Sequence, residues 1–188
     1  PTIGVGNLSA GGTGKTPHIE YLTNMLSAIE GYKPAVLSRG YRRKTKGFVL
    51  ATPSTAVEEI GDEPFQMYAK RPDVPVAVCE DRNLGMDMIA KHCEGVNLVL
   101  LDDVYQHRYI RPDIMVLLTD YAHPFYTDSV IPFGNLREPR NGYKRANIVV
   151  VTKCPTSLSA EEQSQIVAWI KPTEGQKVFF SYMEYGTP

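Results

Sequence analysis

Short apolar runs alternate with longer amphipathic segments along the chain. The runs are rich in Val, Ile and Leu and are bounded by turn-forming or charged residues, which is typical of buried strands. The predicted strands are Thr2–Val5, Pro34–Leu37, Pro75–Val78, Asn97–Leu101, Ile114–Thr119, Asn147–Thr152 and Lys177–Tyr182. Continuous apolar runs of this kind indicate strands that are covered on both faces.

Three of the intervening segments have the spacing of helices. They are Thr16–Glu30, which Gly31 ends, Leu84–Cys93, and a segment from Ser159 to about Trp169. Strands separated by helices predict an α/β, three-layer fold with a mostly parallel sheet and helices on both faces. Ligands bind beyond the carboxyl ends of the strands in such sheets. The polar residues that directly follow apolar runs are therefore of interest, namely Asn7, Ser38, Glu80 and Asp102.

The composition is that of an ordinary globular protein. The 188 residues are 43% hydrophobic and carry a formal net charge of −1, which excludes wholesale disorder and a strongly basic nucleic-acid binder, so no nucleic-acid partner is expected. The three cysteines have no C-x-x-C spacing, so neither a disulfide framework nor a zinc site is indicated. No apolar run approaches the roughly 18 residues of a transmembrane helix. A reducing, cytoplasmic setting fits these features.

A glycine-rich segment, SAGGTGKT, lies between the first predicted strand and the first predicted helix. This context is the one that a phosphate-binding loop requires, and ATP is the expected ligand. Ser9 stands where the usual pattern has Gly, and a glycine-rich turn is the alternative. Ala10 stands where partner-switching ATPases carry a second lysine, which argues against membership of that subgroup. The predicted nucleotide-binding residues are Ser9, Ala10, Gly11, Gly12, Thr13, Gly14, Lys15 and Thr16.

Two aspartates end the strand at 97–101 and are candidates for a magnesium site. In phosphate-loop proteins an aspartate at this place supports Mg²⁺ together with the hydroxyl at the end of the loop, which predicts Thr16, Asp102 and Asp103 as metal-site residues. The alternative is that one of the aspartates caps a following helix. Gln106 and His107 come shortly afterwards; His107 is either a site residue or a partner of the aspartates.

Six segments in this order resemble the tetraacyldisaccharide 4′-kinase family, the lipid A 4′-kinases of Gram-negative bacteria, within the P-loop NTPase superfamily. They are VGNLSAGGTGKTP (5–17), LSRGY (37–41), GDEP (61–64), DR (81–82), LDDVYQHR (101–108) and LREP (136–139). The resemblance runs from about Ile3 to Lys153. Val104 and Tyr105 depart from the Gly and Phe often found after the aspartates, and Arg42 stands where a Gly often follows LSRGY.

The resemblance implies ATP- and Mg²⁺-dependent phosphorylation of the 4′-hydroxyl of an acylated glucosamine disaccharide 1-phosphate, giving lipid IVA at the cytoplasmic face of the inner membrane. Family members usually have an N-terminal membrane-associating segment and a C-terminal lobe. Residues 1–188 are therefore expected to form the nucleotide-binding kinase core, itself soluble. Two other functions stay open: a phosphate-loop kinase for another small-molecule acceptor, and a nucleotide-dependent switch or accessory protein.

The resemblance also implies roles for single residues. Asp62 is the expected base for the sugar hydroxyl, Glu63 supports the metal or orients Asp62, and Lys15 reaches the β- and γ-phosphates. The alternative for this segment is a helix start capped by Asp62, with Pro64 in the first helical position.

Several basic and polar residues are predicted to bind phosphate or substrate. Arg82 is expected to bind a phosphate group; the alternative is a solvent-exposed arginine at a helix start. Arg39 and Tyr41 belong to a basic loop, 39–46, that is expected to hold the anionic head group unless it is simply solvated. The remaining predicted substrate residues are Gln106, His107, Arg137 and Glu138.

Overall fold

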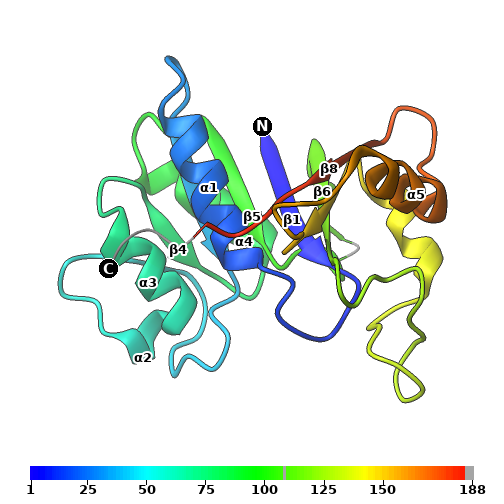
Figure 1. Ribbon diagram of the computed structural model, residues 1–188. Helices are drawn as coiled ribbons and strands as arrows, with labels where there is room; N and C mark the ends of the chain where they lie inside the picture. The colour runs from blue at the N-terminus through cyan, green and yellow to red at the C-terminus, as the bar shows by residue number, and fades with distance from the viewer. Residues whose placement is uncertain (108, 185–188) are drawn as a thin grey trace. The chain divides into compact units, whose positions relative to one another are not determined.

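The computed structural model describes residues 1–107 and 109–184, and the chain divides into two compact units (Figure 1). Unit 1 comprises residues 1–5 and 16–113, and unit 2 comprises residues 6–15 and 114–188. Arg108, the last residue of the LDDVYQHR segment, lies outside the described residues, as do residues 185–188 of the predicted domain.

Unit 1 is built on parallel strands in the order β4-β2-β5-β1, with the short β3 antiparallel at the edge next to β4. Its strands are β1 (Thr2–Asn7, of which residues 2–5 belong here), β2 (Pro34–Ser38), β3 (Val49–Leu50), β4 (Val76–Val78) and β5 (Leu98–Asp102). Its helices are α1 (Lys15–Ser27), α2 (Val57–Ile60), α3 (Asp62–Lys70) and α4 (Arg82–His92).

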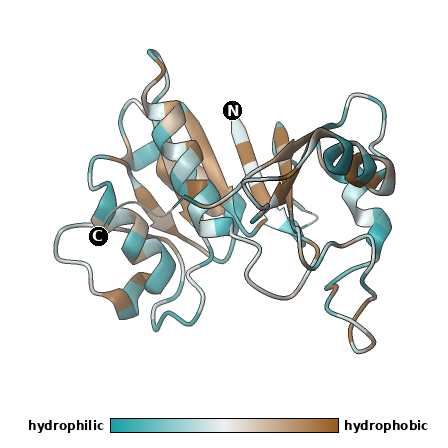
Figure 2. Cartoon of the chain, in the orientation of Figure 1, coloured by the Kyte–Doolittle hydropathy of each residue, from teal (hydrophilic) through white to brown (hydrophobic). Residues whose placement is uncertain are grey.

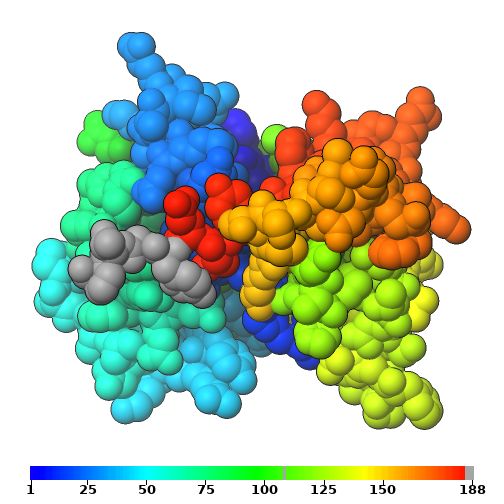
Figure 3. Space-filling model, viewed as in Figure 1, coloured from blue at the N-terminus to red at the C-terminus, as the bar shows by residue number. Residues whose placement is uncertain are grey.

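Unit 2 contains three parallel strands in the order β6-β7-β8. They are β6 (Ile114–Asp120), β7 (Ile148–Thr152) and β8 (Lys177–Phe180), accompanied by the 3₁₀ helix η1 (Arg140–Arg145) and by α5 (Ala160–Ile170). Ser159 caps α5, because its side chain accepts a hydrogen bond from the Glu162 amide and the Glu162 carboxylate accepts from the Ser159 amide. Helix α5 lies on the surface of unit 2, where Figure 3 shows it in orange.

The predicted α/β fold with mostly parallel strands is confirmed, and every predicted strand and helix is present within a few residues. Most of the strand boundaries shift by one or two residues, and two helix boundaries also differ from the prediction. The first helix ends at Ser27 rather than Glu30, and the second begins at Arg82 rather than Leu84. Asp81 starts the second helix early by accepting hydrogen bonds from the amides of Asn83 and Leu84.

The core of each unit is formed by its strands, which appear brown in the hydropathy colouring of Figure 2. All residues of β2 and β4 are buried. Gly85 of α4 lies against this layer, since a Cβ atom there would sit 2.8 Å from the Leu37 side chain. Close contact at Gly85 fixes α4 on β2 and so positions Arg82 at the carboxyl end of these strands.

No helix among residues 1–107 and 109–184 is both long and apolar enough to cross a membrane.

Candidate functional site

The glycine-rich loop of unit 2 follows β1 directly and leads into α1 at Lys15. Gly11 and Gly14 have φ angles of 138° and 84°, which residues with a Cβ atom rarely adopt. The backbone of the loop can therefore follow this path because these two positions are glycine. This is the strand–loop–helix arrangement that the sequence predicts.

Side chains of unit 2 bind three successive carbonyl groups of the loop. The Asn7 amide donates to Gly11 O at 3.2 Å, Lys153 Nζ donates to Gly12 O at 2.6 Å, and Thr152 Oγ1 donates to Thr13 O at 2.9 Å. The acceptors of the loop are thus directed towards the protein. A loop held in this way can present backbone N–H groups to an anion.

Lys153 also forms an ion pair with Asp120, with 2.8 Å between Nζ and Oδ2. Burial alone would raise the pKa of Asp120, but the hydrogen bonds from Lys153 and from the Ala122 amide outweigh it and lower that pKa. Lys153 itself has a φ of 56°, a conformation that is uncommon for a residue other than glycine. An ionised carboxylate therefore holds the lysine that contacts the loop.

A cavity of about 300 Å³ in unit 2 adjoins this loop. Its lining consists of residues 9–13 of the loop together with Asp120, His123, Asp128, Asn135 and Lys153. Asn135 also accepts a backbone hydrogen bond from the Ala10 amide at 2.6 Å, which fixes the start of the loop. The cavity has both acidic and basic walls, as a site for a polar ligand requires.

Arg137 and Glu138 are held inside unit 2. The Arg137 guanidinium donates to Asn7 Oδ1 and to the Asn7 carbonyl, and the Arg137 amide donates to Leu8 O at 2.7 Å. Glu138 is only 8% exposed and accepts hydrogen bonds of 2.8 and 3.0 Å from Arg145. Arg137 therefore lies beside the residues that lead into the loop, whereas the Glu138 carboxylate is bound by an arginine of its own unit.

In unit 1, Thr16 is joined to the acidic pair of the GDEP segment. Thr16 Oγ1 donates to Glu63 Oε2 at 3.0 Å, and Asp62 is the first residue of α3. A helix does start in this segment, as the alternative expects, but the cap position belongs to Gly61 rather than Asp62, and Pro64 is the third helical residue rather than the first. Gly61 has a φ of 89°, and a Cβ atom there would lie 2.9 Å from Tyr41 O.

Asp102 ends β5 and is 3% exposed. Its Oδ2 accepts a hydrogen bond of 3.0 Å from Ser38, the last residue of β2. Residues 103–107 form turns and irregular backbone rather than a helix, so the expectation that Asp102 or Asp103 caps a following helix is wrong. Asp103 instead takes a left-handed conformation with a φ of 46°.

Arg82 is buried at the first position of α4, with 1% of its surface exposed, so the solvent-exposed alternative is wrong. Its Nη1 donates to Cys79 O at 2.7 Å, and its Nη2 donates to Asp102 O at 3.3 Å. Burial lowers the pKa of Arg82, and the Asp102 charge opposes that effect. Arg82 thus connects the ends of β4 and β5.

His107 is partly buried, and its pKa is lowered mainly by burial and further by the positive charges of Arg82 and Arg39. The Asp103 charge acts in the opposite direction. The imidazole is accordingly neutral at pH 7. His107 is therefore electrostatically coupled to residues at the strand ends rather than remote from them.

The basic loop, 39–46, has both exposed and buried members. Arg39 and Tyr41 are exposed, Tyr41 to 75%, and the Arg42 guanidinium lies 5.2 Å from the centre of the Tyr41 ring. The Arg43 side chain, in contrast, is 2% exposed and pairs with Glu80 at 2.7 Å. The loop is therefore folded at Arg43, and its accessible charges are fewer than the sequence indicates.

The chemistry of these residues fits ATP and Mg²⁺. The loop carbonyls accept hydrogen bonds from the protein, which leaves backbone N–H groups for an anion. These N–H groups, the N-terminus of α1 and the Lys15 ammonium group are suited to phosphate. Among residues 1–107 and 109–184, no three His, Cys, Asp or Glu side chains gather as a metal cluster. Mg²⁺ is commonly bound by one or two carboxylates together with phosphates and waters, so Asp102 or Asp103 with a phosphate-bearing ligand is an adequate set.

Comparison with known protein families adds an independent result. The model of the family described as tetraacyldisaccharide-1-P 4′-kinase matches residues 1–184. The chain belongs to this family. It is 51% identical over 185 residues to the tetraacyldisaccharide 4′-kinase of Flavobacterium johnsoniae, and 47% identical over 188 residues to that of Phocaeicola vulgatus. The alignments cover 98% and 99% of this chain but 54% and 51% of those proteins, so the chain spans about half their length.

A solved structure of the kinase family has the same fold. LpxK from Aquifex aeolicus, crystallised in complex with ATP, superposes with a TM-score of 0.77 at 34% identity. The superposition covers 96% of this chain and 53% of that chain. The α/β fold of this chain is therefore shared with a member of the family that was crystallised with ATP.

Some residues of the candidate site are not among those that the sequence singled out. Asp120 and Asn135 line the cavity beside the loop, and neither belongs to a recognisable motif. A usable signal exists for Asp120, because it is the last residue of β6 and so lies at the carboxyl end of a strand. Asn135 lies in an irregular segment, and nothing in its sequence context marks it.

Proposed function

We propose that this chain is the nucleotide-binding core of a kinase that transfers the γ-phosphate of ATP to the 4′-hydroxyl of tetraacyldisaccharide 1-phosphate. The family match over residues 1–184 supports the activity. The observation that carries the residue assignment is the 3.0 Å hydrogen bond from Thr16 to Glu63, which joins the end of the phosphate-binding loop to the acidic pair of α3. We further propose that the complete protein acts at the cytoplasmic face of the inner membrane.

Bound ATP with Mg²⁺ supplies the phosphoryl group and neutralises the charge that develops on its oxygens. The loop backbone orients the phosphates, and Lys15 holds their negative charge. Thr16, with Asp102 or Asp103, provides oxygen ligands for the metal. These groups act by alignment and electrostatics rather than by covalent chemistry.

Asp62 is the group that takes the proton from the sugar hydroxyl. It lies in the first turn of α3, next to the residue that binds Thr16. An ionised carboxylate is a weak base at neutral pH, so its contribution depends on being held in line with the hydroxyl. The exposed Arg39 and Tyr41 of the basic loop are suited to the anionic head group of the substrate.

The test uses the complete natural protein with Mg²⁺, γ-labelled ATP and tetraacyldisaccharide 1-phosphate in detergent. We expect label in the lipid, lost in Lys15→Ala and reduced at least about a hundredfold in Asp62→Asn. Asp87→Asn is the matched control, because Asp87 is an exposed aspartate of α4 outside the proposed site.

Each other outcome identifies a different function. Equal transfer to an unacylated disaccharide indicates a kinase for another acceptor. ATP hydrolysis without labelled lipid, stimulated by a protein partner, indicates a nucleotide-dependent switch. Full activity in Asp62→Asn removes Asp62 from the role of base.

A further inference from the structure

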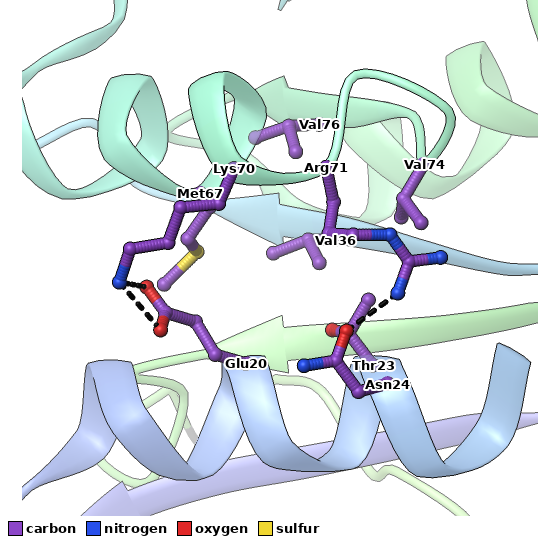
Figure 4. Close-up of a pocket in the computed structure, with 9 residues that line it drawn as sticks. All are labelled: Glu20, Thr23, Asn24, Val36, Met67, Lys70, Arg71, Val74 and Val76. Carbon is purple, nitrogen blue, oxygen red and sulfur yellow. Dashed lines mark hydrogen bonds and ion pairs between the residues drawn. The ribbon is translucent and has the colours of Figure 1, made fainter. Parts of the chain in front are cut away.

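Helices α1 and α3 of unit 1 run side by side in the same direction (Figure 4). Hydrogen bonds join α1 to α3 at two places and to Arg71, the residue that directly follows α3, at a third. They are Thr16 with Glu63 at 3.0 Å, Glu20 with Lys70 at 2.8 Å, and Asn24 with Arg71 at 2.5 Å. We call this set of three pairs the α1–α3 seam. Its first pair contains the metal-site threonine and the neighbour of the proposed base.

Apolar packing under the seam is incomplete. A cavity of about 40 Å³ lies between the two helices and the strands below them. Figure 4 shows Val36, Met67, Val74 and Val76 around it, and it shows the Glu20–Lys70 and Asn24–Arg71 pairs at its edge. Side chains that border a void lack contacts on one side, so packing alone fixes the helix positions less firmly than in a filled core. The polar pairs therefore have a larger share in setting the alignment.

The middle pair has the best geometry of the three. Lys70 Nζ lies 2.8 Å from both oxygens of the Glu20 carboxylate. Lys70 is in the last turn of α3, and Glu20 is one turn beyond Thr16 on α1. A bidentate contact at this place resists sliding of α3 along α1. Sliding would move Asp62 and Glu63 relative to Thr16.

We propose that the Glu20–Lys70 ion pair is a positioning element for phosphoryl transfer, which sets the place of the first turn of α3 beside the first turn of α1. The inference rests on the proposed function, because it assigns the consequence to Asp62 and Glu63. Neither Glu20 nor Lys70 is a catalytic residue in this account. They act through the helices that carry the reacting groups, where small misplacements reduce the rate strongly.

The exposure of the pair makes the proposal testable. The Lys70 and Glu20 side chains are 50% and 23% exposed, so their ion pair contributes little to global stability. A variant that breaks the pair should stay folded. Its effect on rate can then be separated from an effect on folding.

The experiment compares Lys70→Glu, Glu20→Lys and the double swap in the complete natural protein. We expect each single variant to lower kcat by about fivefold, with the KM for ATP within about twofold of wild type, because alignment rather than nucleotide binding is disturbed. The double swap restores the ion pair and should recover most of kcat. Lys91→Glu is the control, since Lys91 is an exposed lysine in the last turn of α4.

Hydrogen–deuterium exchange of residues 61–66 gives a readout that does not depend on turnover. Exchange there should be faster in Lys70→Glu, restored in the double swap, and unchanged in Lys91→Glu. Unchanged exchange and kcat in the single variants, or a swap that recovers neither, would overturn the proposal. If the wild-type protein transfers no phosphate, the proposed function fails, and the exchange results still decide whether the ion pair aligns α3.

Discussion

Lys153 illustrates how much of the candidate site depends on single side chains at strand ends. Its ammonium group donates to Gly12 O at 2.6 Å and pairs with Asp120 at 2.8 Å. The same group therefore fixes the loop and is fixed by the Asp120 carboxylate. The left-handed backbone of Lys153, with a φ of 56°, turns the chain sharply after β7. Such conformations persist where the surroundings stabilise them.

Replacing Lys153 by Met should raise the KM for ATP about fivefold and leave kcat within about twofold. A hydrogen bond from a charged group contributes about 1.5–3 kcal/mol when buried, and the partial exposure of this lysine reduces that to about 1 kcal/mol. Steady-state kinetics at varied ATP measure the change. Lys177→Met, at an exposed position of β8, is the control and should leave both constants unchanged. An equal fall in kcat would assign Lys153 to the chemical step.

Arg82 has a structural role that can be measured without any nucleotide. Arg82→Lys should lower the free energy of unfolding by about 2 kcal/mol, because an ammonium group cannot reproduce the planar donors that reach the Cys79 and Asp102 carbonyls. Chemical denaturation of the protein without ligand measures the loss. Arg111→Lys, at an exposed position, should change stability by less than about 0.5 kcal/mol. A stable Arg82→Lys variant with impaired transfer would instead favour the phosphate role expected from the sequence.

The sequence identifies which residues can carry chemistry better than it identifies their contacts. Asp102, Thr16 and Lys15 are recognisable because their types follow strands or the glycine-rich loop. The burial of Arg82, the Arg43–Glu80 pair and the Glu138–Arg145 pair are not, because they depend on residues distant in the chain or on loop geometry. A charged residue in a motif is therefore a candidate until its partners are known.

At the scale of elements, the turn before α3 is as demanding as the helix itself. Gly61 has a φ of 89° and a ψ of 161°, a combination that is nearly restricted to glycine. It also passes close to the backbone of Tyr41, in the basic loop. The start of α3 and the path of that loop are thus fixed by the same residue.

Gly61→Ala should lower the free energy of unfolding by about 3 kcal/mol, since it combines backbone strain with a Cβ contact of 2.9 Å to Tyr41 O. Gly31→Ala is a matched control, because Gly31 also has a φ of 89° but a Cβ atom added there would have no neighbour within 4 Å. It should cost only about 1 kcal/mol. Thermal and denaturant unfolding compare the two, and equal losses would show that the close approach to Tyr41 is unimportant.

Elements with strong periodicity can be predicted, and short ones cannot. The long strands and helices follow from runs of Val, Ile and Leu and from helical spacing. Strand β3 has two residues and α2 has four, too few for any period to be visible. For α3 the sequence indicates only a helix start, because Pro64 and the two acids mark a beginning but the six residues that follow are too few to show a helical period.

At the scale of the whole molecule, ionisable groups in both units tie stability to pH in two different ranges. In unit 2 the Asp120 carboxylate has a lowered pKa, so its contribution is present above the unfolded value of about 3.9 and is lost as the pH falls through the folded value. In unit 1 a group with a shifted pKa is His107, which, unlike the aspartate, is neutral when deprotonated. Its lowered pKa means that the unfolded chain takes up the proton first.

Stability should therefore begin to fall as the pH drops below about 6.5, the unfolded histidine value, well before the carboxylates titrate. His107→Gln removes the proton uptake and should flatten the pH dependence of the unfolding midpoint between about pH 7 and 5. His92→Gln, at an exposed histidine stacked on Phe48, is the control. Denaturant titrations across this range measure the slopes, and a wild-type slope retained in His107→Gln but lost in His92→Gln would assign the proton uptake to α4 instead of the strand ends.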